Sequence, residues 1–338
     1  MDDSTDQAGP RVTIVTLSRR AGVSPSTVSR ALRGDPRISK SVRRSITALA
    51  AAEGYLPNAV ARGLASGRSG LIGLALGPTE NPLYARLLQL AVQEAAGRGL
   101  RFLVMHAGEG AVDEDTAATI LGYQLDGCLI TSADLSSRAA EICARQRVPV
   151  VMVNRVARLH ASAVTCDNRG GARAMAKFLV EGGHRRIAVV HVGGRSSPGL
   201  ERERGFLEAL AEAGQGALLR EEAVSTYDSG FAAGQRIAAG AERPDAVFAV
   251  SDIIARGVMD ALRAAGLRVP EDVSVTGFDD IADAARPAYA LTTAAQPLAT
   301  MVTRALDLLE ARIADPQAPD ETVTLSTRLV VRGSARRG

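Results

Sequence analysis

The stretch AGVSPSTVSRALRG, residues 21–34, concentrates side chains that donate and accept hydrogen bonds. At helical spacing its apolar residues fall on one side and its polar residues on the other. A helix of about two turns is too short to enclose a substrate, so its polar side must meet a molecule outside the chain. A guanidinium bonds O6 and N7 of guanine together, whereas a hydroxyl bonds a base or a phosphate. This chemistry indicates nucleic acid, with Arg30 as the base reader and Ser26 able to bond either group.

Three short helices are predicted to position this polar face. Thr13 can cap a first helix that stops at Gly22, and Ser24 can cap a second helix whose first position is Pro25. A third helix is expected from about residue 39 to residue 53. Three such helices with a glycine turn between the first two form a helix-turn-helix unit, whose second helix enters the major groove of DNA. The alternative is an ordinary three-helix bundle with an exposed polar face.

Charge is segregated along the chain. Residues 11–70 carry eleven Lys or Arg and two acidic residues, whereas residues 71–338 carry 29 basic and 32 acidic residues. A basic N-terminal part on a slightly acidic remainder favours binding of a polyanion by that part alone. The DNA-contacting residues that we predict there are Thr13, Ser24, Pro25, Ser26, Thr27, Ser29 and Arg30.

The next segment, LPNAVARGLASGRSG at residues 56–70, predicts a short helix and a linker. Asn58 can cap a helix that runs to about Ala65. Isolated helices shorter than roughly 12 to 15 residues are marginal in water, and Gly63 weakens this one further. The segment should therefore fold only where DNA and a second copy of the chain bury Val60 and Leu64. The alternative is a plain linker.

From Leu71 onward, continuous apolar runs alternate with amphipathic helical stretches. The runs are LIGLAL, RFLVMH, GCLIT, VPVVMV, RIAVVHV, AVFAV and VSVTGF, and a final apolar strand, RLVVRGS, follows a helix at residues 297–312. Such runs are typical of parallel strands that are covered on both faces, and their alternation with helices predicts doubly wound α/β structure. Ligands bind such folds at the carboxyl ends of the strands. The pattern leaves open whether the strands form one sheet or two.

Catalytic chemistry is hard to find in this sequence. No G-x-G-x-x-G follows the first strand, and the two lysines, Lys40 and Lys177, do not form a P-loop. His184 precedes a strand and is expected to be structural. The cysteines, which we expect to be buried thiols, are Cys128, Cys143 and Cys166. We therefore expect no enzyme, no metal site and no cofactor.

The N-terminal residues MDDSTDQAGP lack the features of a secretory signal. No apolar run reaches the roughly 20 residues that span a bilayer. The expected location is the cytoplasm, without membrane contact, and residues 1–10 are expected to be a disordered tail.

Several motifs in order resemble the lactose-repressor (LacI/GalR) family of transcription regulators. They are VTIVTLSRRAGVSPSTVSRALRG, GYLPNAVARGLASG, PDAVFAVSDIIARGVMDALRAAGLRVPEDVSVTGFDD, LTTAAQP and RLVVRGS. The resemblance runs over essentially the whole chain after Pro10. It implies a homodimer whose helix-turn-helix units, residues 11–56, read the two halves of a palindromic operator. It also implies that the hinge segment, residues 57–70, pairs in the minor groove through Asn58, Ala61 and Leu64, with Leu64 as the wedge.

For the remainder, the resemblance implies two lobes like those of type I periplasmic binding proteins. The first lobe would hold about 71–165 and 295–325, and the second about 166–293 and 327–338, so that the chain crosses between them near 165, 294 and 326. A small-molecule effector, whether a sugar, a sugar derivative or another polar metabolite, would bind between the lobes and alter operator affinity by changing their angle. Carried over by position, its contacts would be Tyr84, Ser132, Asn154, Arg155, Arg202, Asp252 and Asp279.

Two of these residues also suit a ligand on chemical grounds. Arg202 can clamp an anion or hydroxyls, and Asp279 ends an apolar strand where a carboxylate would face a ligand. The alternative for each is a surface ion pair.

The sequence departs from the family pattern at three places. Thr16 stands where an aspartate is usual, Ala65 where a basic residue is frequent, and Ser225 where an aromatic residue is frequent. Little aromatic surface remains to stack on a sugar, so a polar or acidic metabolite fits somewhat better than a simple hexose. No leucine heptad follows Val331, so a dimer rather than a tetramer is expected. The rival interpretation is a solute-binding protein of a transporter, which would share the body's fold.

Overall fold

The computed structural model describes residues 12–55, 68–76, 80–107, 111–131, 134–156, 160–193 and 196–336. The chain divides into two compact units, Met1–Ser69 and Gly70–Gly338. We call residues 12–55 the head and residues 70–336 the body. The predicted contacts Asn58, Ala61, Leu64 and Ser132 and the predicted tail lie outside the described residues. Within the described ranges, no helix has the length and apolar character needed to cross a membrane.

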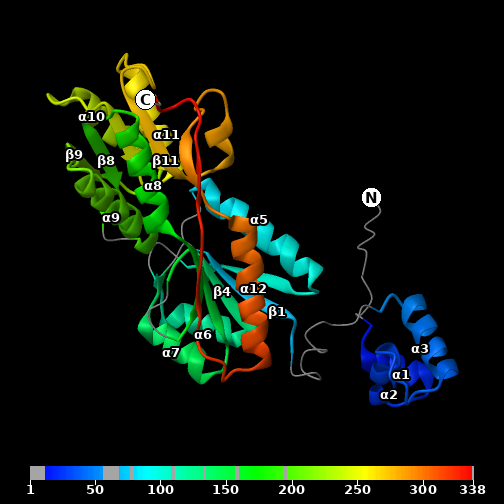
Figure 1. Ribbon diagram of the computed structural model, residues 1–338. Coiled ribbons are helices and arrows are strands. Elements are labelled where there is room, and N and C mark those ends of the chain that lie inside the picture. The colour runs from blue at the N-terminus through cyan, green and yellow to red at the C-terminus, as the bar shows by residue number, and fades with distance from the viewer. Residues whose placement is uncertain are drawn as a thin grey trace, which may run out of the picture. The chain divides into compact units, whose positions relative to one another are not determined.

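The head is a bundle of three short helices (Figure 1), α1 (Ile14–Ala21), α2 (Pro25–Leu32) and α3 (Lys40–Ala52). The Thr13 hydroxyl caps α1, and Gly22 ends it in the left-handed conformation with φ 65°. The Ser24 hydroxyl caps α2. The core of the bundle consists of Leu17, Val28, Ala31, Ile46 and Ala50, all buried.

The first sheet of the body has six parallel strands in the order β13-β7-β6-β4-β1-β2. They are β1 (Leu71–Leu76), β2 (Arg101–His106), β4 (Gly127–Thr131), β6 (Val150–Val153), β7 (Ser162–Cys166) and β13 (Thr322–Leu325). A small separate pair is formed by β3 (Ala111–Val112) and β5 (Asp134–Leu135).

The second sheet also has six strands, in the order β14-β12-β11-β10-β8-β9. They are β8 (Ile187–His191), β9 (Leu219–Glu222), β10 (Ala246–Ala249), β11 (Ser274–Asp279), β12 (Thr292–Ala295) and β14 (Arg328–Val330). All neighbours are parallel except β12 and β14, which pair antiparallel.

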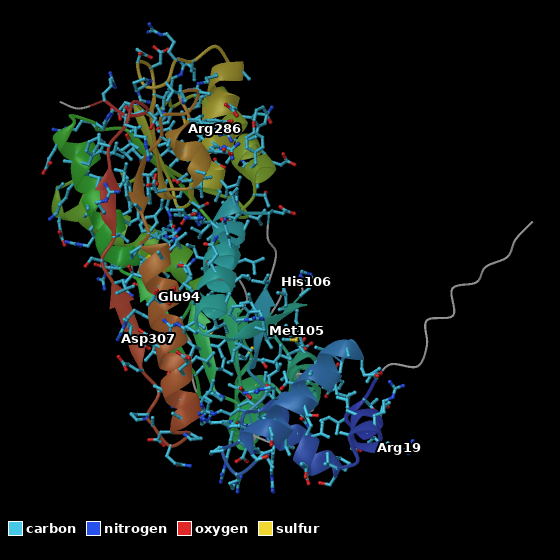
Figure 2. All side chains as sticks on the ribbon, turned by 90° about the vertical axis from the view of Figure 1, so that its right-hand side faces the viewer. Arg19, Glu94, Met105, His106, Arg286 and Asp307 are labelled. Atoms are coloured by element: carbon cyan, nitrogen blue, oxygen red, sulfur yellow. The ribbon has the colours of Figure 1, made fainter. Side chains whose placement is uncertain are left out.

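Helices cover the sheets, and buried apolar residues of the helices and strands form two large clusters. They are α5 (Pro82–Gly97), α6 (Glu114–Gly122), α7 (Ser137–Arg145), α8 (Asn168–Glu181), α9 (Ser197–Glu212), α10 (Tyr227–Ala239), α11 (Asp252–Ala264), the 3-10 helix η2 (Ala282–Ala285) and α12 (Leu298–Ala314). Both α5 and α12 belong to the first sheet's layer and lie side by side (Figure 1). Arg98, which follows α5, joins the two through Glu94 and Asp307, the latter on α12 (Figure 2).

The chain passes between the two sheets three times. It leaves the first sheet after β7, returns from β12 through α12 to β13, and leaves again from β13 to β14. The predicted fold class, a helix-turn-helix head on a body of two doubly wound lobes, is confirmed. The strands of the body form two large sheets rather than one.

One expectation about the strands is wrong. The run RFLVMH predicts a strand covered on both faces, yet β2 lies at the edge of its sheet. Its Arg101, Val104 and His106 are exposed, and Figure 2 shows Met105 and His106 at this edge. An apolar run alone therefore does not distinguish a central strand from an edge strand.

Candidate DNA-binding surface and effector cavity

The start of α2 gathers hydroxyl groups on the surface of the head. The Ser24 Oγ accepts the Thr27 N–H at 3.2 Å and lies 2.8 Å from the Ser26 Oγ and 2.9 Å from the Thr27 Oγ1. Ser24, Pro25 and Ser26 are exposed. The N-terminus of a helix carries a partial positive charge and unpaired N–H groups, so these hydroxyls surround a point that favours a phosphate.

Arg30 is exposed on the same helix, and its backbone carbonyl accepts the Asp35 N–H at 3.1 Å, but its guanidinium makes no hydrogen bond to another described residue. Its acidic neighbour Asp35 is held by Arg37, whose Nη2 donates to Asp35 Oδ2 at 2.7 Å. This hydrogen bonding lowers the pKa of Asp35 to about 2. Since Asp35 is occupied by Arg37, the Arg30 guanidinium stays available for a partner outside the head.

The other acidic residue of the described head is also occupied, because Glu53 pairs with Arg20. Arg43 donates to the Gly34 carbonyl at 2.8 Å and so helps to fix the end of α2. The head therefore presents cations that its own carboxylates do not neutralise. They are Arg19, Arg30, Arg33, Lys40, Arg43 and Arg44.

Thr16 shows what replaces the usual capping aspartate. Its N–H donates to the Thr13 Oγ1 at 3.2 Å, and the two hydroxyls lie 3.1 Å apart. The cap of α1 thus persists with a hydroxyl pair in place of a carboxylate. Thr13 is exposed, and Thr27 and Ser29 are half-buried.

A cavity of about 320 Å³ lies in the body, lined by residues from both sheets' layers. The first sheet contributes the segment that starts α5 and the segment that follows β6. The second sheet contributes the ends of β10 and β11 and the segments that start α9, α10 and α11. The cavity thus lies where carboxyl ends of strands and N-termini of helices meet, as expected for ligand binding in this kind of fold.

An ion pair forms one wall of the cavity. Arg202 Nη1 donates to Asp279 Oδ1 at 2.9 Å and to the Val250 carbonyl at 2.8 Å, and its Nε donates to Asn168 Oδ1 at 2.7 Å. The guanidinium also stacks 3.9 Å from the centre of the Phe278 ring. Arg202 is 4% exposed and Asp279 is 2% exposed, so the pair is almost completely desolvated.

Asp279 is aimed into the cavity by an unusual backbone. Its φ of 131° and the φ of 57° at Asp280 are rare for residues with side chains. Asp279 Oδ1 also accepts Gln296 Nε2 at 2.7 Å, and Oδ2 accepts Asn81 Nδ2 at 3.5 Å from the opposite layer. Burial raises the pKa of the Asp279 carboxyl, while Arg202 acts against that rise.

Two buried side-chain oxygen atoms in the cavity wall make no hydrogen bond to any residue that the structure describes. They are Oδ1 of Asn154 and Oγ of Ser251. Ser251 precedes α11 but does not cap it with its side chain. Buried polar groups without a partner are costly, so these atoms are suited to a ligand that donates hydrogen bonds.

Tyr84 is the aromatic residue of the cavity lining. It is half-buried, and burial raises the pKa of its hydroxyl. The positive charge of Arg155 acts against that rise.

The structure brings five of the predicted effector residues together in this lining, namely Tyr84, Asn154, Arg155, Arg202 and Asp279. Asp252, also predicted to contact the effector, is not among the lining residues of this cavity. Its carboxylate points instead to the Ile281 N–H at 3.0 Å and the Thr293 hydroxyl at 2.5 Å, and its neighbour Ser251 faces the cavity. At the junction of a strand and a helix, one residue of difference reverses the side to which a side chain points.

Sequence reasoning missed several lining residues and one supporting residue. The missed positions that carry polar groups are Glu80, Asn81, Ser196, Thr226, Ser251 and, behind Asp279, Gln296. A signal existed for Asn81, because Asn followed by Pro82 after an apolar strand is typical of the start of a helix. Its Oδ1 accepts the Leu83 N–H at 3.0 Å and caps α5.

The three cysteines are free thiols and buried, as predicted. Burial raises the pKa of Cys128 to about 12 and that of Cys166 to about 11. Thiols with such pKa values are poor nucleophiles and poor metal ligands. Among the described residues, no group of three or more His, Cys, Asp or Glu is placed to hold a metal ion.

A helix-turn-helix head with uncompensated cations, joined to a two-sheet body with a ligand cavity, defines a ligand-controlled DNA-binding regulator. Residues 13–58 match the family model described as bacterial regulatory proteins, lacI family, and residues 176–335 match the periplasmic binding protein-like domain. Over 336 residues the chain is 33% identical to the HTH-type transcriptional regulator CelR of Thermobifida fusca, covering 96% of this chain and 98% of the relative.

Solved structures agree with these matches. A lac repressor dimer bound to operator and the anti-inducer ONPF superposes with a TM-score of 0.87 at 26% identity, covering 96% of this chain and 99% of that chain. A complex of the regulator CelR with cellobiose gives a TM-score of 0.72 at 31% identity, covering 96% and 100%. The chain belongs to the LacI family of bacterial transcription regulators.

Proposed function

We propose that this regulator is a repressor that binds a palindromic operator as a homodimer. Its affinity for the operator changes when a small polar effector occupies the cavity. The observation that carries the proposal is the free guanidinium of Arg30 beside the hydroxyl cluster of Ser24, Ser26 and Thr27. A base reader next to a phosphate anchor is the arrangement that a recognition helix needs.

In the proposed complex, Arg30 bonds a guanine edge and the hydroxyls at the start of α2 bond phosphate oxygens. Thr13 and Ser29 add phosphate contacts. In the hinge segment, which lies outside the described residues, Asn58, Ala61 and Leu64 are proposed to meet the minor groove.

The cavity supports an effector that is polar and close to neutral. Four charged residues line it, and the positive charges of Arg155 and Arg202 balance the negative charges of Glu80 and Asp279. The free acceptor atoms of Asn154 and Ser251 call for hydroxyl or amine donors on the ligand. A sugar, a sugar derivative or another polyhydroxylated metabolite meets these requirements.

Control of DNA binding follows from the three passages of the chain between the sheets. We propose lobes of about 71–165 with 295–325 and about 166–293 with 327–338, which change their angle when the cavity is filled. A coupling free energy of about 1 to 3 kcal/mol would regulate operator affinity by roughly 5- to 150-fold.

Fluorescence anisotropy with the full chain tests the proposal. Labelled palindromic duplexes, selected from a randomised pool, should bind with a steep salt dependence, and scrambled duplexes should bind more weakly. Arg30→Ala should weaken discrimination at one symmetric pair of base positions by about 1 to 3 kcal/mol. The control Arg268→Ala changes an exposed arginine of the body and should leave binding unchanged.

The rival interpretation, a solute-binding protein of a transporter, predicts a different result. A solute-binding protein would show sugar-dependent thermal shifts but no preference for any duplex at low salt. That result, with a folded head in the same sample, would overturn the proposed function.

A further inference from the structure

Asp252 is a fully buried carboxyl at the start of α11 that joins three elements. Its Oδ2 accepts the Ile281 N–H at 3.0 Å, just after the turn that carries Asp279. Its Oδ1 meets the Thr293 hydroxyl on β12 at 2.5 Å. Asp252 therefore ties the helix, the turn and the neighbouring strand together behind the cavity.

The surrounding chain is shaped to admit this carboxyl. A Cβ at Gly277 on β11 would collide with Asp252 Oδ1, so only glycine leaves the space. The tied turn contains the positive φ angles of Asp279 and Asp280, which are unfavourable where a side chain is present. The tie at Ile281 helps to hold Asp279 in the orientation that faces Arg202.

The two buried aspartates, Asp279 and Asp252, differ in the positive charge and hydrogen-bond donors that surround them. Asp279 receives the guanidinium of Arg202 and the amides of Gln296 and Asn81. Asp252 receives one backbone N–H and one hydroxyl, and no cation pairs with it among the described residues.

The other charged groups near Asp252 do not supply a counter-charge. Asp280 is engaged by Arg332 at 2.6 Å, and Arg256, on α11 itself, pairs with Asp283 at 2.8 Å. Two carboxylates that share a dry site with a single guanidinium cannot both ionise at low cost.

We propose that Asp252 is a positioning residue that works as a neutral carboxylic acid, so that of the two buried aspartates only Asp279 carries a negative charge. In this form Asp252 Oδ2 still accepts the Ile281 N–H, while its Oδ1–H donates to the Thr293 oxygen. Both ties survive protonation because the hydroxyl of Thr293 can act as acceptor as well as donor. This role of Asp252 rests on the proposed function, because it assumes that the cavity is the effector site.

The pKa of Asp252 agrees with this assignment. Burial, and next the negative charge of Asp279, raise it to about 7 from an ordinary value of 3.8. Between about pH 4 and pH 7, the Asp252 carboxyl of the folded protein then keeps a proton that the same carboxyl of the unfolded chain has already released. In this pH range a rising pH destabilises the folded protein, and the unfolding constant increases by up to tenfold for each pH unit.

Thermal unfolding of the full chain from pH 5 to pH 8 tests the assignment without effector or DNA, so its outcome is independent of the proposed function. Asp252→Asn imitates the neutral acid, keeping an acceptor for Ile281 and a donor for Thr293. The unfolding constant of the wild type relative to this variant should rise about fiftyfold between pH 5 and pH 7 and level off near a hundredfold above pH 8. Asp279→Asn, the matched control, should be less stable than the wild type at every pH because it leaves Arg202 without its carboxylate.

Infrared difference spectra give a signature that a purely structural role would not produce. The wild type at pH 6 should show a carboxylic acid carbonyl band that is missing from Asp252→Asn and lost as the pH rises past about 7. Asp252→Ala should be less stable than Asp252→Asn at all pH values. The proposal is overturned if Asp252→Asn is as destabilised as Asp279→Asn at pH 8, or if the wild type lacks the band.

Discussion

Replacing Arg202 with Met should show how much the buried ion pair of the cavity contributes. The change keeps an unbranched side chain against Phe278 but removes the donors to Asn168, Val250 and Asp279. Removing one partner of a buried pair costs about 3 to 5 kcal/mol, because the other charge stays behind without compensation. Protonation of Asp279 limits the loss, since its pKa rises further once Arg202 is gone.

The loss can be measured by thermal unfolding followed by near-ultraviolet circular dichroism. The chain has no Trp, and of its five Tyr only Tyr55 precedes the body, so the tyrosine signal reports mainly the body. A loss of 3 to 5 kcal/mol corresponds to a fall in Tm of roughly 6 to 20 °C for a unit of this size. The exposed pair of Arg169 and Glu208 provides the control, and Arg169→Met should cost about 0 to 1 kcal/mol.

The double variant Arg202→Met with Asp279→Asn tests the reasoning. It removes the buried charge together with its partner, so at least half of the stability lost in Arg202→Met should return. An Arg202→Met protein that melts within 2 °C of Arg169→Met, or a double variant no better than Arg202→Met, would refute the argument that Arg202 compensates a buried charge.

Further predictions concern local structure. Ser24→Ala removes the cap of α2 and should lower the stability of the head by about 0.5 to 2 kcal/mol, measured by far-ultraviolet circular dichroism on melting. Gly257→Ala would push a methyl group into the Tyr227 backbone between α10 and α11 and should cost about 1 to 3 kcal/mol, whereas Gly97→Ala, which meets open space, should not destabilise the protein. The buried thiol of Cys128, with its pKa raised to about 12, should resist maleimide labelling until the body unfolds, and rapid labelling of the native protein would contradict its placement.

Local signals made the head predictable from the sequence. Thr13, Ser24 and Gly22 act within a few residues of their own positions, so the caps and the turn could be assigned without knowing the tertiary structure. The long apolar strands of the body could be found for a similar reason, because burial on both faces leaves a continuous apolar run.

Other features depend on distant parts of the chain and left no such signal. Strands β7 (SAVTC), β12 (TTAA) and β13 (TVTL) are short and rich in Thr or Ser. Each has a pairing partner that lies far away in sequence, because β7 pairs with β13 and β12 pairs with β14. The sequence likewise could not show that Asp252 turns behind the cavity wall, since that depends on the space left by Gly277 and on Thr293 of another strand.

The link between the cavity and the rest of the first layer passes through α5. Asn81 caps this helix and also reaches Asp279 in the opposite layer, but at 3.5 Å that hydrogen bond is long and weak. At the other end, Arg98 pairs with Asp307 at 2.9 Å and Glu310 at 2.7 Å, both on α12. A ligand that competes for Asp279 would therefore break this contact between the two layers, while the ion pairs of Arg98 keep α5 and α12 together. The two helices should respond as one body, which is how a change of a single hydrogen bond in the cavity can reach the surface of the layer.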